Sequence, residues 1–254
     1  MGAVTEALVR RWLDQAQHVV ALTGAGVSAE SGVPTFRDAQ TGLWARFSPE
    51  ELATESAFRA HPQRVWDWYV ARREALSGVR PNEGHLALAR YARRHPGKLT
   101  LVTQNVDGLH QRAGQPFTLA LHGDIQSERW LDEPRGCCAG GPPMPGRPPR
   151  CAVCGNLRRP AVVWFGETLP ADILSAAQEA SAACDLMLVV GTSGAVYPAA
   201  GLVHTARRAG GRVVIVNPQA TELDDIADGL LRGGSAQILG RLLDGDPATG
   251  RENC

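Results

Sequence analysis

The chain has 254 residues, enough to bury a sizeable core in one large domain or in a domain with a smaller insert. Its 26 Lys and Arg residues balance its 26 Asp and Glu residues, without a dense run of either sign, which excludes the strongly basic charge of a typical nucleic-acid-binding protein. No apolar stretch reaches the roughly 18 residues that a membrane span needs. We therefore expect neither nucleic acid nor a membrane as a partner.

The N-terminal residues and the cysteines indicate the cellular compartment in which we expect the protein. Residues 1–14 lack the apolar core of a signal peptide, and Glu6 stands where a myristoylation signal needs Ser or Thr. Six cysteines, two of them spaced as Cys151-x-x-Cys154, favour a metal site or free thiols in a reducing compartment. We expect a cytoplasmic monomer.

Four apolar, β-branched runs each end in a polar or glycine-containing turn, and helical patterns separate them. The expected strands are 18–22, 99–102, 186–190 and 213–216, and the expected helices are 86–94, 171–182 and 199–208. This alternation predicts an α/β fold with a Rossmann-like, doubly wound parallel sheet. Ligands bind such sheets at the carboxyl ends of the strands, so we expect the polar turns to meet at one site.

Two segments interrupt the alternation. Residues 43–82 are helical in pattern and rich in Trp and Arg, and residues 127–159 carry cysteines. Within the second segment, ten of the sixteen residues from 134 to 149 are Pro or Gly. These residues favour neither a helix nor a central strand, so a loop is predicted there. A disordered tail is expected over 244–254.

The turn after the first strand carries Gly24 and Gly26, which match the first two glycines of the dinucleotide fingerprint, whereas Ala29 takes the third position. Such glycines let backbone amides approach a pyrophosphate, and the N-terminus of the next helix adds a favourable dipole. A tight turn without a ligand would explain the glycines equally well. The continuation Pro34-Thr-Phe-Arg37 makes the segment specific, because it adds a ring and a guanidinium close to the turn.

Four further motifs follow along the chain: Thr-Gln-Asn-Val-Asp-Gly-Leu-His at 103–110, Leu-His-Gly at 121–123, Val-Val-Trp-Phe-Gly-Glu at 162–167 and Gly-Thr-Ser at 191–193. Together they resemble the sirtuins, NAD-dependent protein lysine deacylases, in the family's order and over residues 19–240. The resemblance implies a large NAD-binding domain of residues 1–42, 83–126 and 160–243. It also implies that the inserts 43–82 and 127–159 form a small domain over the main cleft.

The resemblance makes His122 the catalytic base and places Asn105 in the catalytic set. The acyl oxygen of an acyl-lysine would attack the nicotinamide ribose, and nicotinamide would leave. His122 would then take a proton from a ribose hydroxyl, which closes onto the acyl carbon, and water would complete the release of lysine and O-acyl-ADP-ribose. Imidazole suits this task because its ordinary pKa of about 6.5 leaves it mostly neutral at cytoplasmic pH.

The resemblance also implies the residues that hold NAD. Gln104, Asn105 and Asp107 would bind the nicotinamide side, although Asn and Asp also cap turns routinely. Asn217 would help to hold the adenosine half, and its neutral side chain far downstream argues against a hydride-transfer enzyme, which usually places an acidic residue there about 20 residues past the glycines. Phe36 and Arg37 would shield the reacting ribose carbon from water. The expected set is Gly24, Ala25, Gly26, Glu30, Thr35, Phe36, Arg37, Trp44, Gln104, Asn105, Asp107, Gly191, Thr192, Ser193, Asn217 and Ser235.

Tyr69 and Arg72 would share one face of a helix, as residues three apart do. Many amphipathic helices carry such a pair without a function. Here the surrounding residues, 65–73, resemble the sirtuin branch that removes succinyl, malonyl and glutaryl groups, in which this Tyr and Arg bind the acyl carboxylate. The small Ala39 would leave room for the acyl group. We expect desuccinylation and demalonylation together with deacetylation, with a plain deacetylase as the alternative.

A substrate peptide would bind as an added strand between two strand-like edges, at 162–167 and 196–197. Val163, Phe165 and Val196 are the expected contacts. A buried core strand is the alternative for residues 162–165.

The family's structural zinc uses two Cys-x-x-Cys pairs, and only the second, Cys151 and Cys154, stands where it is expected. In place of the first pair, adjacent Cys137 and Cys138 occur later in the chain. Neighbouring side chains in an extended segment point apart, so a four-thiolate site needs a kinked backbone, which Gly136 could allow. Zinc and its absence both remain open.

Two other functions would use the same cleft. An ADP-ribosyltransferase or NAD hydrolase is disfavoured by the intact His122 and by the acyl-reading pair Tyr69 and Arg72. A non-catalytic sensor of NAD or ADP-ribose is disfavoured because His122, Asn105 and Asp107 are all present.

Overall fold

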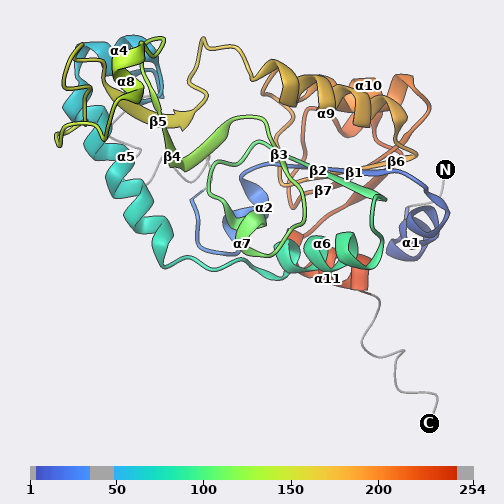
Figure 1. Ribbon diagram of the computed structural model, residues 1–254. Helices are drawn as coiled ribbons and strands as arrows, with labels where there is room; N and C mark the ends of the chain where they lie inside the picture. Colours follow the sequence, from blue (N-terminus) through green and yellow to red (C-terminus); the bar gives the residue numbers. More distant parts are fainter. Residues whose placement is uncertain (1–3, 35–48, 245–254) are drawn as a thin grey trace.

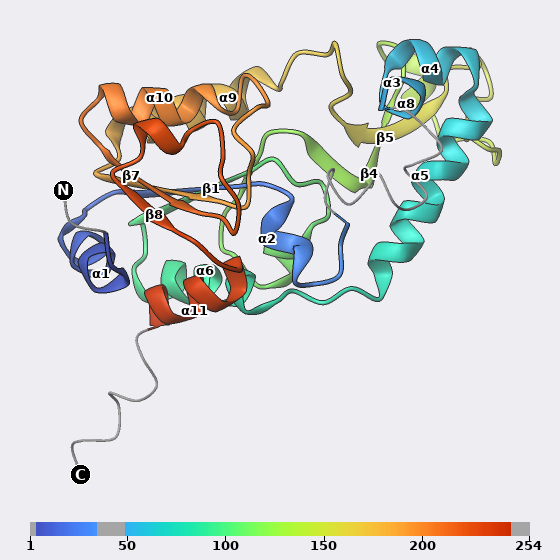
Figure 2. The same ribbon diagram turned by 180° about the vertical axis from the view of Figure 1, so that it is seen from behind.

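The computed structural model describes residues 4–34 and 49–244. A sheet with helices on both faces forms the larger part, and a two-stranded sheet with short helices forms a lobe at one end (Figure 1). The long helix α5, Pro62–Ser77, runs along that lobe (Figure 2). Thr35, Phe36, Arg37, Ala39 and Trp44 lie outside the described residues, as does nearly all of the tail expected to be disordered.

The large sheet has six parallel strands in the order β3-β2-β1-β6-β7-β8. Their bounds are β1 Val19–Thr23, β2 Leu99–Thr103, β3 Leu119–Ala120, β6 Leu186–Val190, β7 Arg212–Val216 and β8 Gly229–Leu231. Every residue of β1 and β6 is buried, as expected for β-branched runs covered on both faces. The four predicted strands and the doubly wound fold are confirmed. The edge strands β3 and β8 were not predicted, because two or three residues are too few to show a pattern.

The strand order reverses between β1 and β6. These two strands pair in register from Val19 opposite Leu186 to Thr23 opposite Val190. β2 lies on the other side of β1, and β7 on the other side of β6. An open α/β sheet binds ligands at such a switch point, outside the carboxyl ends of its strands. The turns after β1, β2, β6 and β7 therefore lie at the same edge.

Helices cover both faces of this sheet (Figure 1). One face packs against α1 Glu6–Gln15, α6 Glu83–Arg94 and α11 Ser235–Asp244, and the other against α9 Ala171–Ala183 and α10 Gly201–Arg208. The three predicted helices correspond to α6, α9 and α10. Asn82 begins α6 because its side chain accepts hydrogen bonds from the backbone N–H groups of Gly84 and His85, as N-cap residues do.

The lobe is built around the antiparallel strands β4 Gly123–Trp130 and β5 Arg158–Val162. Its helices are α3 Pro49–Leu52, α4 Glu55–Ala60, α5 and α8 Gly136–Ala139. Phe58, Trp66, Tyr69, Ile125 and Trp164 are among its core residues. Residues from both inserts thus lie together, while the predicted domain boundaries stay predictions.

The prediction of a loop throughout 134–149 is wrong at α8. The Pro and Gly residues of this segment are unevenly spread, and the stretch from Arg135 to Ala139 contains a single Gly, which leaves room for one helical turn. In the described part of the chain, the remaining short elements are α2 Gly26–Ala29, α7 Leu109–Arg112 and a 3-10 turn, η3 Asp224–Ile226.

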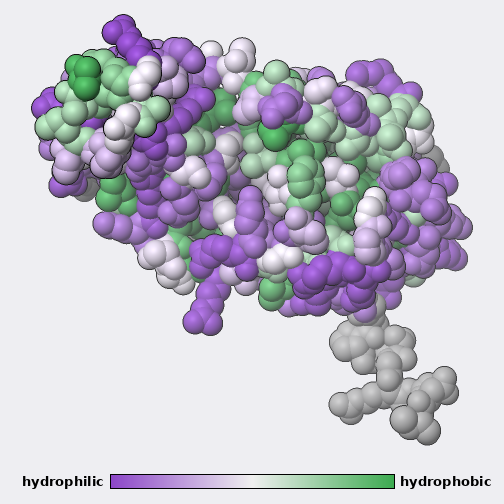
Figure 3. Space-filling model, in the orientation of Figure 1, coloured by the Kyte–Doolittle hydropathy of each residue, from purple (hydrophilic) through white to green (hydrophobic). Residues whose placement is uncertain are grey.

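Among residues 4–34 and 49–244, no helix combines the length and the apolarity needed to cross a bilayer. On the face seen in Figure 3, hydrophobic residues lie in small groups among hydrophilic ones.

Candidate active site

Three glycines bring the turns after β1 and β6 into contact. The backbone N–H of Gly24 donates to the carbonyl oxygen of Val190 at 3.0 Å, and that of Gly26 donates to the carbonyl of Gly191 at 2.8 Å. A Cβ on Gly26 would lie 2.7 Å from the Cα of Gly191, and one on Gly24 would lie 2.8 Å from the Cβ of Thr192. The glycines therefore serve a close approach of two turns within the protein, in addition to any approach to a phosphate.

The turn after β2 reaches across this contact. The side-chain amide of Gln104 donates from Nε2 to Thr192 Oγ1 at 3.1 Å. Asn105 Nδ2 lies 3.1 Å from the carbonyl oxygen of Gly24 and 3.2 Å from Ser28 Oγ. Since both Nδ2 hydrogens are committed, Oδ1 is the remaining polar atom of the Asn105 side chain for a ligand.

Asp107 is buried and held by the protein. Its Oδ2 accepts a hydrogen bond from Ser28 Oγ at 2.7 Å, and its Oδ1 accepts one from the backbone of Leu109 at 2.9 Å. His85 Nδ1 accepts from the backbone N–H of Asn82, so the proton of this ring lies on Nε2, which is 3.3 Å from Ser28 Oγ. Burial lowers the pKa of His85 to about 4, so the ring is neutral at neutral pH.

A second buried histidine lies beside the first. The His85 and His110 rings are 4.7 Å apart, and His110 Nε2 is 2.9 Å from Thr23 Oγ1. Burial and, secondarily, His85 lower the pKa of His110 to about 3. Ser28, His85 and His110 were not among the site residues predicted from the sequence. Their only local signals were that Ser28 follows the glycine turn and that His110 ends the 103–110 motif.

His122 lies between β3 and β4. Its Nδ1 is 2.8 Å from the carbonyl oxygen of Gln104. Because a carbonyl only accepts hydrogen bonds, Nδ1 carries the proton and Nε2 keeps its lone pair. Burial lowers the pKa of His122, and the Gln104 hydrogen bond opposes that shift. Gly123 follows with φ of +80°, and a Cβ there would lie 2.1 Å from the carbonyl oxygen of Ala161, so only glycine fits where β4 meets β5.

The residues predicted to hold the adenosine half of NAD lie in the turns after β6 and β7, which contact each other. Asn217 Nδ2 donates to the carbonyl oxygen of Thr192 at 2.9 Å, and its Oδ1 accepts from the backbone of Gln219 at 3.2 Å. Ser193 Oγ accepts from the backbone of Ala195 at 3.4 Å. The structure thus places the turn after β7 against the turn after β6.

Glu30 and Ser235 contact each other. Glu30 Oε2 lies 2.6 Å from the backbone nitrogen of Ala236 and 3.3 Å from Ser235 Oγ. A carboxylate in this place stabilises the N-terminus of α11. Ala25 immediately precedes α2. The role of these three residues toward NAD stays a prediction.

Tyr69 and Arg72 lie on α5. Tyr69 is 3% exposed, and its Oη accepts a hydrogen bond from Trp164 Nε1 at 2.9 Å. Burial raises the pKa of Tyr69, so the phenol is neutral. Burial lowers the pKa of Arg72, and the nearby Tyr69 and Asp107 oppose that shift. The guanidinium therefore interacts electrostatically with a residue of the motif that follows β2.

The residues expected to receive a peptide do not form regular strands. β5 ends at Val162, and neither 163–165 nor 196–197 is a strand. The backbone N–H groups of Val163 and Phe165 donate inside the protein, to the carbonyl oxygens of His122 and Ala53 at 2.9 and 2.8 Å. Phe165 and Val196 are nevertheless exposed, at 53% and 41%, whereas Val163 is half-buried. The alternative of a buried core strand fits Val162, which is buried and ends β5. Trp164 is buried but does not lie in a strand, and Val163 and Phe165 are neither fully buried nor in a strand.

Cys137, Cys138, Cys151 and Cys154 come together, with their sulfur atoms all within 4.8 Å of one another. The Sγ atoms of Cys138 and Cys154 are 3.6 Å apart, close to the edge of about 3.8 Å that a tetrahedron with 2.3 Å zinc–sulfur bonds requires. The helical turn α8 supplies the kink, because successive side chains in a helix are not directed to opposite sides. Backbone N–H groups of Cys154 and Val153 lower the pKa of Cys151 to about 6, which favours its thiolate form. The donor set fits a structural zinc ion.

The known proteins that this chain resembles in sequence and in structure are Sir2 proteins and NAD-dependent protein deacylases. Residues 24–198 match the Sir2 family model. The chain is 58% identical over 228 residues to an NAD-dependent protein deacylase of Ralstonia nicotianae, covering 89% of this chain and 91% of that protein. It resembles a Sir2 homolog–NAD complex with a TM-score of 0.85 and 41% identity, covering 96% of this chain and 94% of that one. A Sir2–p53 peptide–NAD+ structure matches with a TM-score of 0.80 and 31% identity, covering 95% and 98%.

Proposed function

The chain belongs to the Sir2 family, and we propose that it removes succinyl and malonyl groups, in addition to acetyl groups, from protein lysines. The general activity is NAD-dependent protein-lysine deacylation, in which NAD is consumed. The acyl preference rests on one observation. A buried phenol and a guanidinium, Tyr69 and Arg72, lie one helical turn apart on α5, and the guanidinium interacts with Asp107.

NAD, when bound, supplies the electrophilic ribose carbon, the nicotinamide leaving group and the hydroxyl that accepts the acyl group. The polar turns at the carboxyl ends of β1, β2, β6 and β7 fit this dinucleotide in character. We propose that Gly24, Gly26, Ser193 and Asn217 hold its adenosine and phosphate parts. Asn105 would present Oδ1 to the nicotinamide side, since its amide hydrogens are already committed.

His122 acts as the general base in this proposal. The carbonyl of Gln104 holds the proton on Nδ1, so Nε2 can take a proton from a hydroxyl without a change of tautomer. Burial lowers the pKa of the ring, which keeps it neutral at neutral pH. The backbone of His122 is fixed as well, because its carbonyl accepts from Val163 at 2.9 Å.

Arg72 would bind the carboxylate of a succinyl or malonyl group through its planar fork, which Lys could not reproduce. Tyr69 would donate its phenolic hydrogen to the same carboxylate. Its oxygen already accepts from Trp164, so the hydroxyl hydrogen is the part left for a partner. An acetyl group lacks this carboxylate and would gain nothing from either residue.

The protein substrate would bind as an extended peptide beside residues 163–165 and 196–197. The exposed Phe165, Val196 and Tyr197 support this placement. The N–H groups of Val163 and Phe165 are engaged inside the protein, so the peptide would donate its own N–H groups to carbonyls of this segment. Because such pairing uses main-chain hydrogen bonds and contacts few side chains of the peptide, we expect the enzyme to have a loose preference for peptide sequence.

The four-cysteine cluster fits a structural zinc ion that joins α8 to residues 151–154. Four thiolates leave no open coordination position, so the ion would stabilise the lobe without taking part in the chemistry. A cytoplasmic location and a monomeric state stay predictions.

The test compares succinyl-, malonyl- and acetyl-lysine peptides of one sequence, with NAD, for the wild type and Tyr69→Phe/Arg72→Met. We expect the variant to lose most of its desuccinylation and to keep deacetylation. Arg64→Met is the matched control, because Arg64 lies on the same helix with a side chain 42% exposed. If acetyl removal dominates and the double variant changes neither activity, the protein is a plain deacetylase. NAD consumption without peptide would indicate a hydrolase instead.

A further inference from the structure

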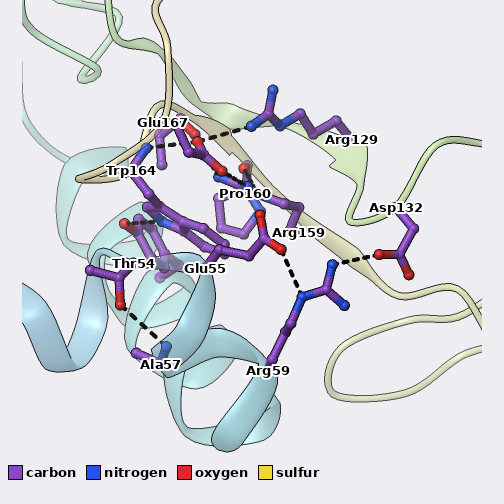
Figure 4. Close-up of polar contacts among 12 residues, drawn as sticks. Thr54, Glu55, Ala57, Arg59, Arg129, Asp132, Arg159, Pro160, Trp164 and Glu167 are labelled. Carbon is purple, nitrogen blue, oxygen red and sulfur yellow. Dashed lines mark hydrogen bonds and ion pairs between the residues drawn. The ribbon is translucent and has the colours of Figure 1, made fainter.

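A buried ion pair that the proposed mechanism does not use lies next to Tyr69. Arg159, on β5, is 1% exposed, and its two Nη atoms contact the two carboxylate oxygens of Glu167, Nη2 at 3.2 Å from Oε2. Figure 4 shows Glu167 between Arg159 and Arg129. The loss of hydration largely offsets the attraction within a buried pair, so stability alone is a weak reason for this one.

The ion pair fixes Trp164 from two directions. Glu167 Oε2 accepts a hydrogen bond from the backbone nitrogen of Trp164 at 2.9 Å. The Cζ atom of Arg159 lies 3.3 Å from the centroid of the indole ring, and Nη2 of the same guanidinium donates to the carbonyl oxygen of Val162 at 2.8 Å. Phe58 packs on the indole with ring centroids 5.2 Å apart. These contacts hold the indole of Trp164 in the observed orientation.

The orientation of the Trp164 indole determines the direction of the hydroxyl group of Tyr69. Trp164 Nε1 donates to Tyr69 Oη at 2.9 Å, and the two residues are 2% and 3% exposed. Because the phenol oxygen receives this bond, its own hydrogen must point to another acceptor. Water has little access to Tyr69, so the indole sets the direction in which that hydrogen is available.

We propose that Arg159 and Glu167 are positioning residues that set the selectivity for acyl groups ending in a carboxylate, acting through Trp164 and Tyr69. This inference rests on the proposed function, in which Tyr69 donates to that carboxylate beside Arg72. Neither Arg159 nor Glu167 touches the acyl group. They determine whether the phenol meets the carboxylate with its hydrogen already aligned.

Three variants of the full-length, zinc-loaded protein test the coupling at saturating NAD. Trp164→Phe keeps a ring and removes the indole N–H, Arg159→Lys keeps the charge and removes the planar fork, and Glu167→Gln removes the carboxylate. We expect each to raise KM for a succinyl-lysine peptide by about tenfold with kcat within about twofold, since the lost contact exists in the ground state as well. KM for the matched acetyl-lysine peptide should change by less than about twofold.

Arg129→Gln is the matched control. Arg129 contacts the same carboxylate at 3.0 Å, but from the solvent side with 49% of its side chain exposed, and we expect neither KM to change. Glu167→Gln leaves a buried guanidinium without its partner, so folding is followed by circular dichroism. If Glu167→Gln unfolds, Trp164→Phe still tests the inference, because it leaves the ion pair intact.

The coupling is measured in the Trp164→Phe/Arg159→Lys double variant. We expect its succinyl KM to equal that of Trp164→Phe alone, because Arg159 acts through the indole. Additive effects, or an equal rise of KM for both peptides, would overturn the inference. If Tyr69→Phe raises succinyl KM and the other variants do not, only the positioning role fails. If the wild type shows no succinyl preference, the proposed function itself fails.

Discussion

The imidazole of His122 is oriented by the backbone of Gln104, whose carbonyl oxygen lies 2.8 Å from Nδ1. The backbone N–H of Gln104 in turn donates to the carbonyl oxygen of Thr23 at the end of β1, at 2.9 Å. The protonated nitrogen of the ring is therefore tied to the central sheet, and the basic nitrogen is the one that remains for substrate.

This geometry predicts the pH dependence of deacylation. Burial lowers the pKa of His122 below its ordinary value of about 6.5, and the base works only when neutral. Activity is therefore present above the lowered pKa and is lost as the pH falls through it. We expect kcat/KM for an acyl-peptide to be level from about pH 7 upward through pH 8 and to fall only below about pH 6.5.

Substitution of the base gives the matching test. His122→Asn should lower the rate of acyl-peptide turnover by about 10²- to 10⁴-fold, the usual contribution of a general base. His204→Asn, on the outer helix α10, should leave the rate unchanged. An acid limb that stays in place in the residual activity of His122→Asn would assign it to another group.

The buried pair His85 and His110 predicts a loss of stability in mild acid. Both pKa values are lowered, to about 4 and about 3, so the unfolded chain binds more protons than the folded one between those values and 6.5. Stability must then rise with pH across this window and be lost as the pH falls through it. Between pH 7 and pH 5 we expect about 2 kcal/mol of lost unfolding free energy for each ring.

Urea denaturation at pH 7 and pH 5 measures this loss. His85→Gln should flatten the pH dependence by roughly one ring's share, about 2 kcal/mol, even though it destabilises the protein at pH 7. His18→Gln, at an exposed position, is the control. An unfolding free energy that stays level between the two pH values would contradict the neutral, buried state of both rings.

The strands and helices of the large sheet could be predicted from the sequence because their pattern is local. A run such as 186–190 is apolar throughout, since the strand is buried on both faces. The network of Ser28, His85 and His110 could not be predicted, because the three residues are far apart in the chain and no local pattern around any of them indicates its contact with the others. Only the folded sheet and α6 bring them together. Ser28 Oγ then contacts both Asp107 and His85, and the ring of His85 lies beside that of His110.

The same limit applies to the lobe. Arg159 is charged and follows another arginine, so its sequence suggests a surface position, yet it is buried against Trp164. Adjacent Cys137 and Cys138 looked unsuited to one metal site until α8 gave their backbone a helical turn. For Arg159 the contact with the Trp164 ring decides the burial, and for the two cysteines a single helical turn, which the many Pro and Gly residues of the segment hid, decides the direction of the side chains.

The contact between Gly26 and Gly191 predicts a severe effect of one methyl group. A Cβ at residue 26 would lie 2.7 Å from the Cα of Gly191, and the atoms nearest to it all belong to the backbone of Gly191, which cannot rotate aside as a side chain can. We expect Gly26→Ala to lower the unfolding free energy by about 1–3 kcal/mol, as overpacking does. It should also weaken NAD binding, since the two turns that meet there would separate.

Gly78→Ala is the matched control for this substitution. Gly78 ends α5 with φ of −85°, and a Cβ there meets nothing within 4 Å. Alanine at such a position should leave stability unchanged or raise it by about 0.4–1 kcal/mol. Equal melting temperatures for the two variants would show that the turns after β1 and β6 can yield.

The four sulfur atoms predict one tightly held zinc ion per chain, measurable by atomic spectroscopy on purified protein. Cys138→Ser should abolish stoichiometric zinc and lower the melting temperature, because α8 is joined to residues 151–154 through this cluster. Cys184→Ser is the matched control, since Cys184 is equally buried but lies outside the cluster. Removal of zinc by a chelator should reproduce the Cys138→Ser melting temperature in the wild type and leave that variant unaffected. A chelator that lowers both melting temperatures equally would show that the metal is bound elsewhere.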